Sequence, residues 1–329
     1  QKNRGGYGSG SDGYVAKNPE FGAVFSYYIK ESPKTLKQER REKEKELIKE
    51  KESIPIPEMD SIRAEDNEIK PYLVFTITDE DGRIIRKLTK SISKGINKVN
   101  WNLRFPGTSP VKIKDGKYDP LSMGGSGMYV LPGKYFVSLS QVVRGEISEL
   151  SDPVGFVVKS LDNTTLPAED REGLVAFQNQ LLELSRVVSG AENYAEELLE
   201  RVRNDKQSAQ RTPETPTELM VKIEDIEKTL DEILWMFNGQ RPKASQEENL
   251  PAIPSINERL GSIVWIHYRS TSGITQSQKD IYEILKEEFP PILKEIKNIS
   301  EVGIPEIEKE LERYGAPWTP GRLPEWHQE

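Results

Sequence analysis

The sequence contains no cysteine and only two histidines, His267 and His327. The lack of cysteine excludes disulfide bonds, thiolate nucleophiles and cysteine-ligated metal sites. A zinc site with several histidine ligands is not expected, because two such residues cannot supply one. The chain also has no apolar run near the roughly 20 residues of a membrane-spanning helix, so we expect no membrane span.

Basic residues are in the minority, with 46 lysines and arginines against 54 aspartates and glutamates and a net charge of −8. Nucleic acids and anionic membranes bind clustered basic faces, so this balance predicts no nucleic-acid partner. The length of 329 residues favours two domains.

Residues 1–17 are rich in glycine and serine and predict a flexible connector. The segment lacks the GK[ST] ending of a phosphate-binding loop. Its Ser11, Asp12 and Gly13 are contiguous, whereas the turn of an Asp-box repeat spaces these residue types apart. The sequence starts at Gln1 without a signal-peptide pattern. We therefore expect that a signal has been removed or that the chain continues a longer protein.

Residues 18–162 have the two-residue period of β-strands. YLVFTIT at 72–78 places alternate apolar side chains on one face, and DEDG at 79–82 predicts a hairpin turn. PGKYFVSLS at 132–140 repeats the alternation after a Pro-Gly turn. Several short strands separated by turn signals indicate an immunoglobulin- or fibronectin-like β-sandwich.

A dense charge run interrupts this predicted sandwich. KTLKQERREKEKELIKEKE at 34–52 contains neither glycine nor proline, and Ser32-Pro33 is typical of a helix start. We expect an inserted, solvent-exposed helix at about 33–53 with charge pairs along its surface. Two interpretations stay open: a solvated insertion between the first two strands, or a helix that docks a partner.

Residues 166–314 change to the period of helices and predict an antiparallel helical bundle. A first long helix is expected to reach about Gln210, loosened at Gly190. Pro290 and Pro291 should kink or break a later helix, because proline removes a backbone donor. The second helix shows the clearest apolar stripe, formed by Leu219, Ile223, Ile226, Leu230, Ile233 and Phe237.

No group of residues predicts catalysis or metal binding. His267 has Trp265 and Tyr268 nearby but neither a neighbouring carboxylate nor a nucleophile, so a packing role is expected. The acidic segments at 79–82 and 114–120 lack the alternating oxygen ligands of a calcium loop. We therefore predict no catalytic residue, no metal and no cofactor for this chain.

Residues 315–329 form a tail that is rich in tryptophan and proline and contains GAPWTPGRLPEW. Two interpretations of Trp318 and Trp326 stay open. The tail could strap back along the bundle and bury both rings, or the rings could bind a glycan or a protein, since exposed tryptophans favour interfaces.

Five segments in order resemble the C-terminal region of large bacterial, Bacteroidetes-type sortilin/Vps10-like proteins with Asp-box (BNR) β-propellers. They are NPEFGAVFSYYIKE, DEDGRIIRKL, GINKVNWNLRFPG, LPGKYFVSL and GAPWTPGRLPEW. The chain departs from the family pattern at Glu20, where the family has a proline.

The resemblance implies β-propeller domains upstream in the same polypeptide and an exported protein that is periplasmic, secreted or at the cell surface. It implies a non-catalytic region that braces the propellers or docks another cell-envelope protein. A glycan- or protein-binding module is the alternative, and any glycosyl hydrolase or sialidase-like activity would lie in the propellers. In that setting Asp60-Ser61-Ile62 matches a short O-glycosylation pattern at Ser61.

Overall fold

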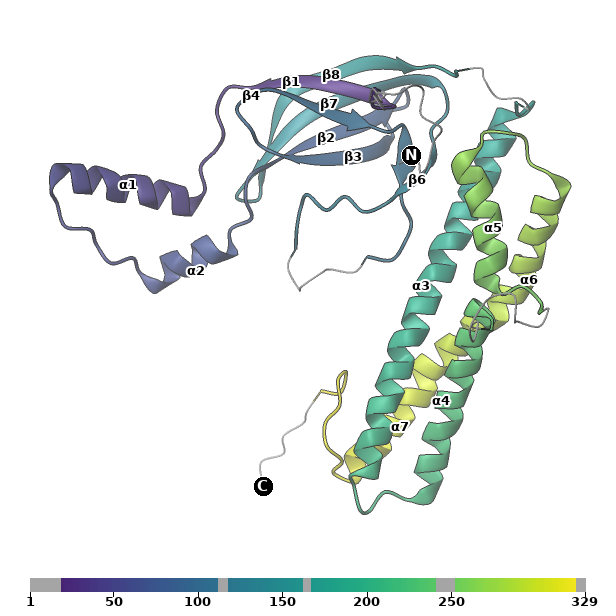
Figure 1. Cartoon of the computed structure of the whole chain (residues 1–329). Coiled ribbons are helices and arrows are strands. Elements are labelled where there is room, and N and C mark those ends of the chain that lie inside the picture. Colours follow the sequence, from purple (N-terminus) through teal and green to yellow (C-terminus); the bar gives the residue numbers. More distant parts are fainter. Residues whose placement is uncertain (1–18, 112–117, 162–166, 241–251, 324–329) are drawn as a thin grey trace, which may run out of the picture. The chain divides into compact units, whose positions relative to one another are not determined.

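The computed structural model describes residues 19–111, 118–161, 167–240 and 252–323 (Figure 1). The chain is mixed α+β with antiparallel sheets, which confirms that part of the prediction. No helix among the described residues is long and apolar enough to cross a membrane.

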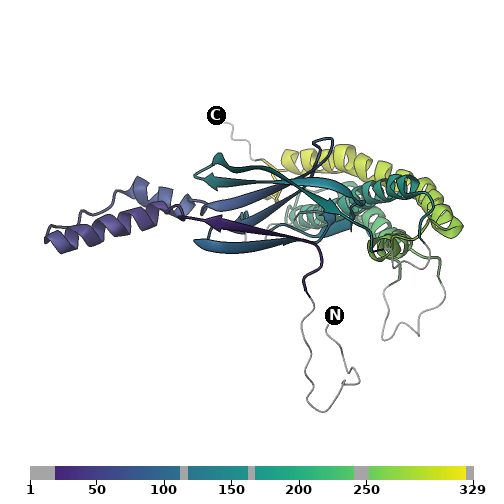
Figure 2. The same ribbon diagram turned by 90° about the horizontal axis from the view of Figure 1, so that it is seen from above.

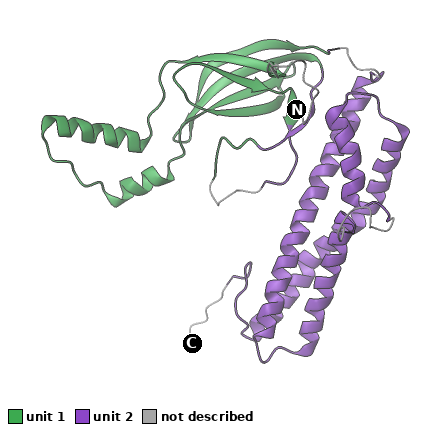
Figure 3. Ribbon diagram, in the orientation of Figure 1, with its two compact units in different colours: residues 1–105, 118–123, 132–160 green, residues 106–117, 124–131, 161–329 purple. Residues whose placement is uncertain are grey.

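The chain divides into two compact units, which Figure 3 colours separately. Unit 1 comprises residues 1–105, 118–123 and 132–160, and unit 2 comprises residues 106–117, 124–131 and 161–329. The segments 106–117 and 124–131, which lie within the range predicted for the sandwich, thus belong to unit 2.

Unit 1 is built on an antiparallel four-stranded sheet of order β3-β2-β7-β8 and a two-stranded sheet, β1-β4. The bounds are β1 (Ala23–Ile29), β2 (Tyr72–Asp79), β3 (Ile84–Ser91), β4 (Gly95–Trp101), β7 (Gly133–Val143) and β8 (Glu146–Val158). The expected hairpin at 79–82 joins β2 to β3. The short strands β5 (Arg104–Pro106) and β6 (Ser126–Tyr129) form a third sheet.

Trp101 lies at the centre of the unit 1 core and is fully buried. Its indole Nε1–H donates to the carbonyl oxygen of Arg104 at 3.0 Å. Its ring meets Tyr135 and Phe156 edge-on, with centroids 5.6 and 6.0 Å away. One side chain therefore connects the last residue of β4 to the larger sheet.

The backbone conformation and close packing at position 22 explain why Gly22 precedes β1. Its φ is +131°, and a Cβ atom built there would lie 2.0 Å from the carbonyl oxygen of Trp101. No larger residue fits so close to backbone, so glycine lets the chain enter β1 directly beside the end of β4.

A helical hairpin of α1 (Leu36–Glu50) and α2 (Met59–Asn67) projects from the sheets of unit 1 (Figure 2). Neither helix has a buried residue. The predicted helix at about 33–53 corresponds to α1, whereas α2 was not predicted from the sequence. The two helices are joined by an ion pair between Arg40 Nε and Glu65 Oε1 at 2.5 Å.

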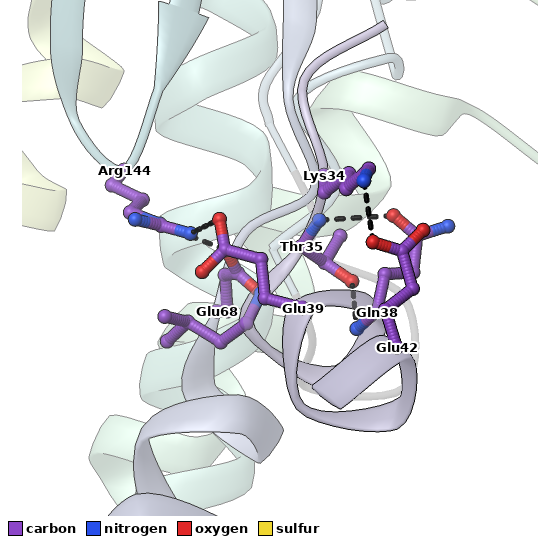
Figure 4. Close-up of polar contacts among 8 residues, drawn as sticks. Lys34, Thr35, Gln38, Glu39, Glu42, Glu68 and Arg144 are labelled. Atoms are coloured by element: carbon purple, nitrogen blue, oxygen red, sulfur yellow. Dashed lines mark hydrogen bonds and ion pairs between the residues drawn. The ribbon is translucent and has the colours of Figure 1, made fainter. Parts of the chain in front are cut away.

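Charged groups fasten the base of this hairpin (Figure 4). Arg144, at the tip of the β7–β8 turn, donates to Glu39 Oε1 at 2.5 Å and lies 3.5 Å from Glu68 Oε1. The other carboxylate oxygen of Glu68 accepts the backbone N–H of Leu36 at 2.7 Å. A capping box between Thr35 and Gln38 starts α1, so the hairpin is held at its base by polar contacts.

Arg144→Gln is expected to loosen the hairpin without unfolding unit 1. Exposed ion pairs contribute about 0–1 kcal/mol each, so global stability should change little. The amides of α1 should exchange with solvent several times faster, as hydrogen exchange measures directly. Arg186→Gln, which removes an exposed pair with Glu183 in unit 2, is the control. Unchanged exchange in α1 would show that Arg144 does not hold the hairpin.

Unit 2 contains α3 (Arg171–Gln210), α4 (Thr217–Asn238), α5 (Ile256–Arg269), α6 (Gln276–Asn298), a π-helical turn η3 (Ile299–Gly303) and α7 (Ile304–Arg313). These helices share one apolar core, to which the predicted stripe of α4 contributes Leu219, Ile223, Leu230, Ile233 and Phe237. In Figure 1, α3 runs the length of the bundle, with α5 and α6 beside its upper part and α4 and α7 beside its lower part.

Two details of the helices differ from expectation. The helix α3 runs through Gly190 without interruption. The prediction for Pro290 and Pro291 is a kink or a break, and the break is wrong because α6 runs through both prolines. Phe289 and Ile292 on either side are buried in the core, and this packing opposes the roughly 3 kcal/mol that each proline costs within a helix. The irregular turn lies further on, at η3.

Candidate functional site

Of the two tail tryptophans, the structure describes Trp318. Trp318 is 44% exposed, and the guanidinium of Arg322 lies 4.7 Å from its ring centroid. Trp326 lies outside the described residues. Ser61, the predicted glycosylation site, is exposed on α2.

The tail does return along α3, but polar groups hold it rather than the Trp318 ring. Ser208 Oγ donates to the carbonyl oxygen of Pro317 at 2.5 Å, and Thr319 Oγ1 donates to Asp205 Oδ1 at 2.7 Å. Ala316 is buried. A strap thus forms over 315–323, but it leaves Trp318 partly open instead of burying it.

Asp205 is the buried anchor of this strap and is fully shielded from solvent. Burial raises its pKa to about 6, and the nearby charge of Glu308 adds to this. The Thr319 hydrogen bond and the charges of Arg322 and Arg201 act in the opposite direction. Its Oδ2 atom has no hydrogen-bond partner among the described residues. The site is therefore sensitive to protonation.

His267 packs within unit 2, where it is 2% exposed and meets the Phe177 ring edge-on at 5.4 Å. Burial lowers its pKa, and a hydrogen bond with Gln278 opposes that effect. Within the described parts of the chain, no group of three or more histidine, aspartate or glutamate residues could hold a metal ion.

The strongest candidate for binding is instead the outer edge of β1. The register pairs Ala23–Ile29 with β4 along the whole strand, and β1 is the end strand of that sheet. In an edge strand, alternate N–H and C=O groups point away from the neighbouring strand. Within the described residues, no strand pairs with this side of β1.

The other sheet edges of unit 1 carry residues that discourage further pairing, whereas β1 does not. Lysine, proline and other charged residues commonly protect edge strands. The strand β3 contains Lys87 and Lys90, β4 contains Lys98, and β8 contains Asp152 followed by Pro153. The sequence of β1, AVFSYYI, has no charge and no proline. This edge is therefore chemically open to another strand.

A groove of about 680 Å³ lies along β1. It is lined by β1 and by residues of β2, β7 and β8, among them Phe75, Leu139, Leu150 and Val154. Leu150 and Val154 are 43% and 60% exposed although they are apolar. The groove also has polar groups, from Ser138, Gln141 and Ser151. An extended segment would find both apolar and hydrogen-bonding groups there.

Two aromatic side chains on the inner face of β1 are only partly covered. Phe25 and Tyr27 alternate with the exposed residues Val24 and Tyr28 and remain intermediate in burial. Tyr27 meets the Phe75 ring edge-on at 5.0 Å. Phe25 and Tyr27 both line the groove.

No protein-family model, no curated protein and no solved structure matches this chain. The resemblance to sortilin-like proteins therefore stays a prediction. The arguments about function rest on the geometry of the described residues.

Proposed function

We propose that the chain is a non-catalytic interaction module that binds an extended segment of another protein by adding it as a strand beside β1. The observation that carries this proposal is the uncharged, unpaired edge of β1 above an apolar groove. In strand addition, backbone hydrogen bonds supply affinity and alternate side chains supply specificity.

The proposed ligand has a definite pattern. Side chains of a strand point alternately to its two faces, so every second residue would enter the groove towards Phe75 and Leu139. Those positions favour valine, isoleucine or an aromatic residue, and the positions between them face solvent and favour polar residues. The opening along β1 spans seven residues, which sets the length of the paired segment.

The added strand also fits an immunoglobulin-like interpretation of unit 1. We propose that the β3-β2-β7-β8 and β1-β4 sheets are the two layers of such a sandwich, with Trp101 in its core. The smaller sheet is two strands wide, and strand addition at β1 would widen it. Sandwiches of this type have sheets of three or more strands, so the added strand would bring the smaller sheet to that width.

We also propose which larger protein contains this chain. The chain would be the C-terminal region of an exported sortilin-like β-propeller protein, with the β1 edge docking a segment of another cell-envelope protein. Partial exposure of Trp318 favours a second candidate, glycan binding in the tail. Arg322 lies over that ring, so at most one face of it is available to a sugar.

A designed peptide tests the strand-addition proposal. A seven-residue peptide that alternates valine with threonine matches the length of β1, and fluorescence anisotropy measures its binding. N-methylation at alternate residues removes outward donors from one edge of the peptide and keeps every side chain. We expect one of the two alternate methylation patterns to weaken binding at least about tenfold, because each lost hydrogen bond contributes about 1 kcal/mol.

Ser26→Lys provides the matched change in the protein, since Ser26 is exposed at the middle of β1. A charge at the centre of the edge should weaken binding, whereas Ser148→Lys on the exposed part of β8 is the control. Equal binding of all methylated peptides, or no effect of Ser26→Lys, would refute strand addition at β1.

A further inference from the structure

We propose that a second surface, on unit 2, binds a basic amphipathic helix of a partner protein. The surface is a groove of about 520 Å³ between the C-terminal part of α4, the start of α5 and the middle of α6. It is independent of the β1 edge, since other residues in a different unit form it.

The apolar part of this groove includes exposed side chains that do not belong to the buried core. The buried stripe of α4 includes Ile233 and Phe237, whereas the neighbouring Trp235 and Met236 are 57% and 44% exposed. Ile253, before α5, is 81% exposed. Tryptophan is enriched among residues that dominate binding energy, and methionine adapts to varied partners. These exposed side chains line the groove together with the buried Ile233.

The rim of the groove is acidic. Glu232, Glu288 and Glu295 line it, and none of the described lining residues is a lysine or an arginine. Arg259 lies 3.7 Å from Glu288 and neutralises part of that charge. Glu232 and Glu295 have no cationic partner among the described residues. An occupant with lysine or arginine beside its apolar residues would complement these two carboxylates.

The shape of the groove favours a helix as the occupant. Its lining extends from Thr229 on α4 to Gly239, the C-cap of that helix, and from Glu288 to Glu295 on α6. At 1.5 Å per residue these stretches are about 10–15 Å long, or two to three helical turns. A helix of that length presents apolar residues at i, i+3, i+4 and i+7, the spacing by which helices occupy such grooves.

Two synthetic helices of about four turns test this proposal. Both carry leucine at the four apolar positions; one has lysine and the other glutamate on the flanks. In calorimetric titrations with the full chain, the lysine helix should bind and the glutamate helix should not. Trp235→Ala should weaken binding at least about tenfold, the effect of losing a dominant interface residue. Trp265→Ala, at another exposed tryptophan of unit 2, should leave binding unchanged.

A charge-reversal variant distinguishes specific binding in this groove from general electrostatic attraction to an acidic protein. The double variant Glu232→Lys/Glu295→Lys should reject the lysine helix and bind the glutamate helix instead. The same reversal at Glu50 and Glu52 of unit 1 should leave the preference for lysine intact. Failure of the lysine helix to bind, equal binding of both helices, or no effect of Trp235→Ala would overturn the proposal.

Discussion

Trp101→Ala is expected to destabilise unit 1 strongly while unit 2 keeps its stability. The ring is fully buried against Tyr135 and Phe156, and removing it leaves a large cavity. Truncation of a buried tryptophan typically costs about 3–5 kcal/mol. A small domain is stable by only about 5–15 kcal/mol, so this loss takes a large part of the margin and nearly all of it at the low end of that range. The carbonyl oxygen of Arg104 also loses its Nε1–H donor.

Hydrogen exchange measures this effect unit by unit. Amides of Leu73, Phe75 and Ile77, which lie on β2 with buried side chains, should lose their protection in Trp101→Ala. Amides of α3 should keep theirs, because α3 belongs to the other unit. Trp265→Ala is the matched control, since that ring is 56% exposed. Retained protection in β2 would show that Trp101 is not the centre of the unit 1 core.

Asp205→Asn is expected to change the pH dependence of unit 2 stability. A carboxyl group whose pKa is raised in the folded state binds its proton more tightly there than when unfolded. The stability from this proton is full below the ordinary value of 3.8 and is lost as the pH rises through about 6. Between pH 5 and pH 8 the loss amounts to about 1–2 kcal/mol.

Urea unfolding of unit 2 at pH 5 and pH 8 tests the predicted fall in stability with rising pH. Between pH 5 and pH 8, the free energy of unfolding of the wild type should fall by about 1–2 kcal/mol more than that of Asp205→Asn. His267, whose lowered pKa acts in the opposite direction, is present in both proteins and cancels in the comparison. Asp231→Asn, an exposed carboxylate on α4, should behave like the wild type. Identical pH profiles for wild type and Asp205→Asn would contradict the raised pKa.

Elements with strong periodicity could be predicted from sequence, because one face of each is buried. The alternation in 72–78 predicts β2, and the stripe from Leu219 to Phe237 predicts α4. The helix α2 escaped prediction because it is nine residues long, has no buried face and follows two prolines. At Pro290-Pro291 the local rule predicts a break, but the core contacts of the flanking residues outweigh it.

The candidate site was harder to predict than the elements that form it. AVFSYYI predicts a strand, yet pairing partners far away in sequence decide whether that strand lies at an edge. The missing charge in 23–29 was the available signal, since protected edges carry lysine or proline. The strap contact between Thr319 and Asp205 joins residues 114 positions apart and has no local signature.

The most direct test of the proposed strand addition is hydrogen exchange of β1 with and without the seven-residue peptide. Pairing on the outer edge would protect alternate amides within Ala23–Ile29, those that point away from β4. We expect these amides to slow at least about tenfold at saturating peptide, while amides of β3 stay unchanged. Bound peptide without any change in the β1 amides would contradict strand addition, because no backbone pairing would then have formed.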